Sequence, residues 1–128
     1  MFLFYSAATV ATVFGALGAT FLFVVSYIHW KVAFDSKNTS GLITKFLIFS
    51  CVTAILFIAG NLFDMGGTSW DFSTKGISYA MIAGNVFSFV ANFLVFKLKK
   101  SNMKAAKEAG LSEQDYYLKH VAPTLSAK

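Results

Sequence analysis

Few side chains in this sequence are of the kinds that carry out chemistry. Its two histidines, His29 and His120, and its one cysteine, Cys51, are far apart along the chain. A structural zinc site takes four such ligands, so these three residues do not predict one. His29 is the one candidate axial ligand for a haem or chlorophyll, but it lies at the end of an uncharged segment, where an interfacial polar residue is expected. We therefore predict that the chain binds no cofactor and no metal.

Acidic and nucleophilic residues also lack a catalytic arrangement. Asp64 and Asp71 flank a short Gly-containing stretch. Two acids in such a turn could attract a cation, but a solvated turn is the simpler explanation. The sequence has no Ser, His and Asp at one membrane depth, no glycine-rich phosphate loop and no carboxylate pair within an apolar segment. It favours a protein that is not an enzyme.

The charged residues divide the chain into three apolar segments. Of its 128 residues, 56% are hydrophobic and 13% are charged, whereas a soluble domain has about 25% charged residues. No charged residue occurs in residues 1–30, 46–63 or 76–96. A helix that crosses a bilayer needs about 20 apolar residues, so we predict an all-α integral membrane protein with three transmembrane helices.

The transmembrane domain is expected to comprise residues 1–97, with spans at about 5–29, 43–63 and 76–96. No positive segment precedes the first apolar run, which is also too long for a signal peptide, so we expect it to be a retained helix. Ten lysines lie in the first connection and after the third span, against one in the second connection. The positive-inside rule then predicts an outer N-terminus and a cytoplasmic, matrix or stromal C-terminus. The membrane would be a bacterial plasma or inner membrane, or an organellar inner membrane.

Small residues recur at four-residue intervals, which places them on one face of a helix. In lipid, such ridges let two helices approach closely, so we predict helix–helix contacts within the chain or with a partner. The ridges are Ala7, Ala11, Gly15 and Ala19, then Ala8, Thr12, Ala16 and Thr20, and in the third helix Ala80, Gly84, Ser88 and Asn92. The many phenylalanines of the spans are expected to face lipid, other subunits, pigments or quinones.

The third helix also has a polar stripe that includes Asn85, Ser88 and Asn92. Asn85 lies near the middle of the span, where an unpaired amide is costly. We expect it to form a hydrogen bond to another helix, which contributes roughly 0.6–2 kcal/mol. The alternative is that the stripe lines a conduction or substrate path. Several residues of the second helix could face the stripe, namely Ser50, Thr53, Gly60, Asn61 and Asp64.

Five lysines follow the third span within eleven residues: Lys97, Lys99, Lys100, Lys104 and Lys107. Positive-inside anchoring and attraction to anionic lipid headgroups both explain such a cluster next to a membrane. Because either use is simpler than binding a nucleic acid, we expect no nucleic-acid partner.

The cytoplasmic, matrix or stromal tail, residues 98–128, contains the signals of a short helix. Ser112 and Asp115 have the spacing of a capping box, and Pro123 closes the stretch, so a helix of about nine residues is predicted at about 113–121. Its apolar surface comprises Tyr116, Tyr117 and Val121 among others. A helix this short is not stable alone, so we expect it to dock, preferably on a partner protein.

Association surfaces without catalytic groups favour a non-catalytic accessory or assembly subunit of a larger membrane complex. That complex would be of the respiratory, photosynthetic, transport or secretion type, and the partners would be larger membrane-protein subunits and membrane lipids. One alternative is a homo-oligomeric pore, because the three-helix, N-out, C-in arrangement with a basic tail resembles one class of holins in topology and length. Another alternative is a small immunity or regulatory protein that binds another membrane protein.

Overall fold

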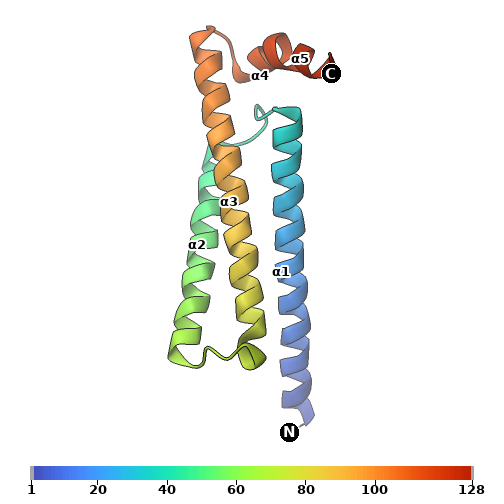
Figure 1. Cartoon of the computed structure of the whole chain (residues 1–128), viewed down its shortest axis with the longest axis vertical. Coiled ribbons are helices and arrows are strands. Elements are labelled where there is room, and N and C mark those ends of the chain that lie inside the picture. Colours follow the sequence, from blue (N-terminus) through green and yellow to red (C-terminus); the bar gives the residue numbers. More distant parts are fainter. Residues whose placement is uncertain (1, 128) are drawn as a thin grey trace.

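Three long helices form an elongated bundle in the computed structural model (Figure 1). The structure describes the backbone of residues 2–127 and the side chains of residues 9–127. The helices are α1 (Phe2–Ser36), α2 (Thr44–Gly67) and α3 (Phe72–Glu108). Each contains a segment that is long and apolar enough to cross a membrane, which confirms the prediction of three such helices. Both α1 and α3 continue as helices beyond the spans expected to end at residues 29 and 96.

Helix α3 is the centre of the bundle. Helices α1 and α2 both pack along it and hardly touch each other. The contact of α1 with α3 depends on small residues, since a Cβ atom on Gly84 would lie 3.4 Å from the backbone oxygen of Ala19. The rings of Phe23 and Phe87 pack beside this crossing, with centroids 4.3 Å apart. Because α1 and α2 both pack on α3 and hardly on each other, a space remains between them.

The connection between α2 and α3 is fixed by short-range polar contacts. Asp71 caps the start of α3 by accepting hydrogen bonds from the backbone N–H and the hydroxyl of Ser73. These hydrogen bonds lower the pKa of Asp71 below its ordinary value, and the bond from the Ser73 hydroxyl has the larger effect. Lys75 forms an ion pair with Asp64 at 2.6 Å, which ties α3 to the end of α2.

At the opposite end, an apolar cluster joins all three helices. Its buried members are Ala33 of α1, Leu47 of α2 and Val95 of α3. Partly buried side chains pack around it, namely Trp30, Phe34, Leu42 and Phe96. The cluster closes the bundle at the end from which the C-terminal segment departs.

Helix α3 ends in a Schellman motif around Gly110. Gly110 adopts φ = 67°, in the left-handed region that favours glycine. Its N–H donates to the carbonyl oxygen of Lys107 at 3.1 Å, and the N–H of Leu111 donates to that of Ala106 at 2.9 Å. These bonds satisfy carbonyls that the helix end would otherwise leave open.

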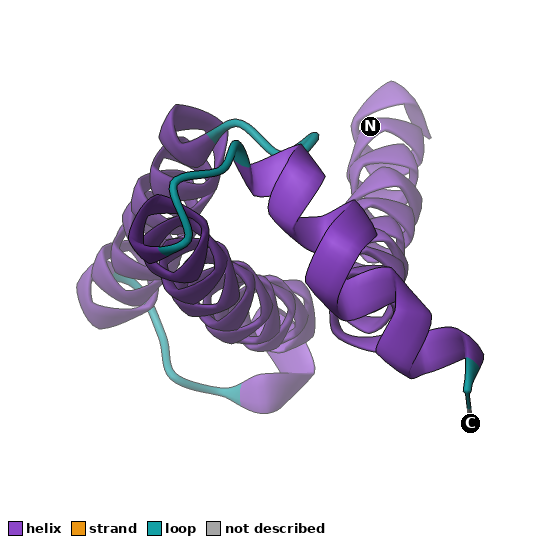
Figure 2. Ribbon diagram, turned by 90° about the horizontal axis from the view of Figure 1, so that it is seen from above, coloured by secondary structure: helices purple, strands orange, loops and turns teal. Residues whose placement is uncertain are grey.

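The C-terminal helical segment, residues 113–126, then runs across the end of the bundle (Figure 2). It consists of α4 (Glu113–Tyr116), a π-helical turn η1 (Tyr117–Val121) and α5 (Ala122–Ser126). The hydroxyl of Ser112 accepts the cap hydrogen bond from the N–H of Asp115 at 3.1 Å. The expected end at Val121 and Pro123 is wrong, because Pro123 lies in the first turn of α5, where its missing N–H is tolerated.

Replacing Gly110 with alanine should loosen this segment. A Cβ atom in the left-handed region costs about 1–2 kcal/mol, and the strain falls on the turn that orients residues 113–126. Hydrogen–deuterium exchange of the detergent-solubilised protein should be faster there than in the wild type. The control Gly67→Ala adds a methyl group in open space at a residue without positive φ. Equal exchange in the two variants would contradict the role assigned to Gly110.

Candidate functional site

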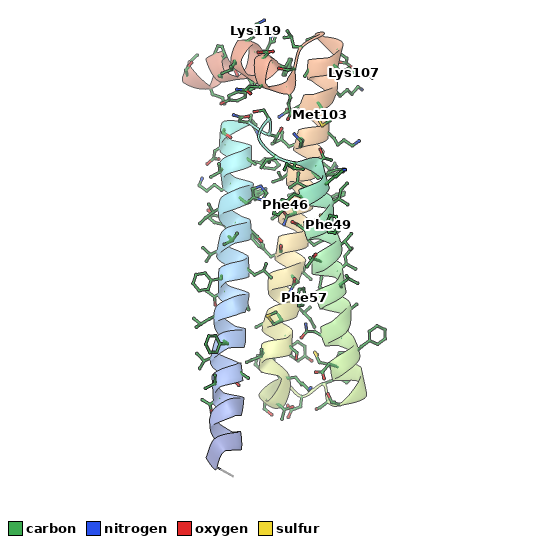
Figure 3. The ribbon with its side chains drawn as sticks, turned by 180° about the vertical axis from the view of Figure 1, so that it is seen from behind. Phe46, Phe49, Phe57, Met103, Lys107 and Lys119 are labelled. Carbon is green, nitrogen blue, oxygen red and sulfur yellow. The ribbon has the colours of Figure 1, made fainter. Side chains whose placement is uncertain are left out.

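A groove of about 650 Å³ runs between α1 and α2, with α3 as its floor. Most of its wall is apolar, including Phe46, Phe49 and Phe57, which occupy successive levels of α2 (Figure 3). The floor is the polar stripe of α3, with Asn85, Ser88 and Asn92. The groove exists because α1 and α2 pack on α3 rather than on each other.

The groove brings together polar residues from all three helices. Ser26 and His29 of α1, and Ser50 and Thr53 of α2, line it with the α3 stripe. Ser50 and Thr53 therefore face the stripe as expected, whereas Gly60, Asn61 and Asp64 of the same helix line a separate depression.

The hydrogen bonds of the asparagines differ from those expected. The amide nitrogen of Asn85 donates to the carbonyl oxygen of Met81 at 2.8 Å, within α3. That of Asn92 likewise donates to the carbonyl oxygen of Ser88 at 2.8 Å. The predicted interhelical hydrogen bond of Asn85 is wrong, because the groove separates its amide from polar groups on α1 and α2.

The small-residue ridges are used only in part within the chain. Ala19, Gly84 and Ser88 are buried, and Gly15 is half-buried against Ile77. Exposed members are Ala11, Thr12, Ala16, Thr20 and Ala80. The side chains of Ala7 and Ala8 lie outside the described residues. Ala16, Thr20, Ala80 and the neighbouring Ala83 border a shallow depression on the α1–α3 side of the bundle, which we call the small-residue face.

A second group of polar residues lies at the end of the bundle from which the C-terminal helical segment departs, which we call the tail end. The sequence did not predict this group. The ammonium of Lys99, only 4% exposed, forms an ion pair with Glu113 Oε2 at 2.7 Å. It also donates to the carbonyl oxygen of Thr39 at 2.9 Å, while the Thr39 hydroxyl donates to Glu113 Oε1 at 2.5 Å. Asn102 donates to the Thr39 hydroxyl oxygen at 2.8 Å and to the carbonyl oxygen of Lys37 at 3.0 Å. This network joins the α1–α2 connection, α3 and α4.

The structure separates Lys99 from the other lysines of its cluster. Lys97, Lys100, Lys104 and Lys107 are exposed, whereas Lys99 faces the opposite side of α3. The prediction that Lys99 binds lipid headgroups is wrong, because its charge is buried and already paired with Glu113. A signal was present in the sequence, since Val95, Lys99, Asn102 and Ala106 recur at the spacing of one helix face.

The remaining predicted site residues occupy the C-terminal helical segment. Tyr116, Tyr117 and Val121 are half-buried, while Ser112 and Asp115 are exposed at the cap. Leu118 is 56% exposed. Cys51 is half-buried, with its thiol 4.0 Å from the carbonyl oxygen of Phe89.

These features define the class: a small integral membrane protein with three apolar helices long enough to span a bilayer. No family model matches the chain, and no solved structure matches it. An uncharacterized protein of Ureaplasma parvum serovar 3 is 40% identical over 48 residues. The matched segment covers 38% of this chain and 26% of that protein, so the similarity carries no functional assignment.

Proposed function

We propose that the chain is a non-catalytic accessory subunit whose small-residue face binds a transmembrane helix of a larger membrane protein. One observation carries the proposal: the ridges of α1 and α3 extend beyond the surface that these two helices bury against each other. Ala16, Thr20, Ala80 and Ala83 remain exposed on one side of the crossing. Small side chains of this kind let a further helix approach to backbone distance.

The chemistry of the small-residue face suits a helix. The hydroxyl of Thr20 donates to the carbonyl oxygen of Ala16 at 2.9 Å, so it is satisfied within α1. A partner helix therefore needs no matching polar group at this residue and gains close van der Waals contact instead. The exposed Leu118 and Lys119 of the C-terminal helical segment offer a second contact on the tail side.

The proposal includes an orientation. Nine of the ten lysines in the described part of the chain lie at the end of the bundle that carries the C-terminal segment or in that segment, and Lys75 lies at the other end. We place the tail end on the cytoplasmic, matrix or stromal side, following the positive-inside rule. The contact with a larger subunit would then continue from the bilayer onto the inner surface.

Enlarging two residues of the small-residue face tests this function. In the double variant Ala16→Leu, Ala80→Leu, two bulky side chains should prevent close approach, and the protein should lose its larger partner during purification in mild detergent. The control Gly60→Leu enlarges an exposed residue of α2 that has open space around it. The proposal fails if the double variant retains the same partners, in the same proportion, as Gly60→Leu.

A further inference from the structure

Several polar side-chain atoms that line the groove between α1 and α2 have no hydrogen-bond partner in the part of the chain that the structure describes, although they are not fully enclosed by protein. Ser26 is 5% exposed, yet its hydroxyl has no hydrogen-bond partner among the residues that the structure describes. Serine in a helix commonly bonds the carbonyl four residues earlier, as Thr20 and Ser36 do in α1. The Ser26 hydroxyl is an exception and lies in the groove wall.

The two asparagines of the floor have unused capacity as well. Asn85 is 2% exposed and Asn92 is 6% exposed. Each amide uses its NH₂ group for bonds within α3. A primary amide offers two N–H donors and an oxygen that accepts two hydrogen bonds. The side-chain oxygens of both residues therefore lack a donor within the part of the chain described here.

Unused polar groups at this depth call for a particular kind of occupant. In the bilayer core, leaving a polar group unpaired is strongly unfavourable. The amide oxygens of Asn85 and Asn92 only accept, so an occupant must present a donor, such as a hydroxyl. The Ser26 hydroxyl and the second amide N–H of Asn85 can donate to carbonyls, whereas the NH₂ group of Asn92 already has two acceptors on Ser88. The groove-lining residues include no Asp, Glu, Lys or Arg, so a charged headgroup would have no fixed counter-charge there and a neutral occupant is favoured.

The size of the groove favours a lipid over a helix. Its 650 Å³ falls within the range of about 300–1,000 Å³ typical of small-molecule sites. A transmembrane helix about 10 Å wide and 30 Å long occupies roughly 2,400 Å³, several times more. Phe46, Phe49 and Phe57 extend along α2 beside the polar floor, where an acyl chain can pack.

We propose that the groove between α1 and α2 binds a neutral lipid that carries a free hydroxyl next to ester carbonyls, the chemistry of a diacylglycerol. The lipid hydroxyl donates to the amide oxygen of Asn85 or Asn92, the carbonyls accept from the Ser26 hydroxyl and the second amide N–H of Asn85, and one chain lies along the phenylalanines. This site is on the other side of α1 from the small-residue face, so it is independent of the proposed partner helix.

Native mass spectrometry of the full-length, delipidated protein in detergent tests the site, with dioleoylglycerol as the probe. One bound dioleoylglycerol is expected per chain, whereas dioleoylphosphatidylglycerol, which has a charged headgroup, and a quinone without hydroxyl groups should bind at least fivefold more weakly. Removing one hydrogen bond reduces affinity about fivefold, so Ser26→Ala and Asn85→Leu should each weaken binding by about that factor.

The matched control is Asn61→Leu. Asn61 also bonds within its own helix, to the carbonyl oxygen of Phe57 at 2.8 Å, but it lies outside the groove. If Asn85→Leu fails to fold, the binding of dioleoylglycerol by Ser26→Ala alone tests the proposal. Equal binding by wild type, Ser26→Ala and Asn61→Leu overturns the proposal, as does equal binding of all three lipids. The proposal would also be overturned if the wild-type protein made liposomes permeable and both Ser26→Ala and Asn85→Leu abolished that permeability. The groove would then be a water-filled path.

Discussion

Replacing Lys99 with methionine is expected to detach the C-terminal helical segment from the bundle. The substitution leaves Glu113, whose side chain is 15% exposed, without its cation. Removing one member of a buried ion pair typically costs about 3–5 kcal/mol. Because Glu113 begins α4, this cost is met by releasing residues 113–126 into solvent. Hydrogen–deuterium exchange and limited proteolysis of that segment should both increase strongly.

The chain provides its own control for this result. Lys100→Met removes the same charge from the neighbouring residue, which is exposed, and should leave the segment protected. The double variant Lys99→Met, Glu113→Gln removes both charges, so it should recover part of the lost protection. Similar exchange in Lys99→Met and Lys100→Met would show that the ion pair does not anchor the segment.

Replacing Gly84 with leucine should have the second large effect. A Cβ atom there already lies 3.4 Å from the Ala19 backbone oxygen and 3.7 Å from Leu22 Cδ2, so a longer side chain must push α1 away from α3. Overpacking of this kind costs about 1–3 kcal/mol. The midpoint of thermal unfolding in detergent should fall, and Gly84→Ala, which adds only the Cβ, should have a much smaller effect.

Gly60→Leu again supplies the comparison, because Gly60 is a helical glycine with open space around it. Its unfolding midpoint should remain close to that of the wild type. If Gly84→Leu and Gly60→Leu unfold at the same temperature, the Ala19–Gly84 crossing does not stabilise the bundle.

Charge distribution alone was enough to predict the three apolar helices, because a bilayer imposes both a length and an absence of charge on each span. The small-residue pattern correctly indicated Ala19 and Gly84 as a contact. It did not distinguish them from Ala16 and Ala80, because a four-residue repeat marks a helix face without saying which neighbour covers each turn.

The polar contacts were harder to predict, since they depend on how distant segments meet. The ion pair joins Lys99 to Glu113 and to the backbone of Thr39, sixty residues earlier. In the sequence, Lys99 is one lysine among five, and only its shared face with Val95 and Ala106 sets it apart. Asn85 was expected to bond a neighbouring helix, but the separation of α1 from α2 is a property of the packing and not of any local pattern.

The most direct test of the proposed function is the composition of the particle that contains this chain. The tagged wild-type protein, expressed at its natural level and extracted with a mild detergent, should be analysed by native mass spectrometry. We expect the 14.0 kDa chain in a heteromeric complex with at least one larger membrane subunit in fixed proportion. Recovery solely as a free monomer or a pure homo-oligomer would contradict its assignment as an accessory subunit.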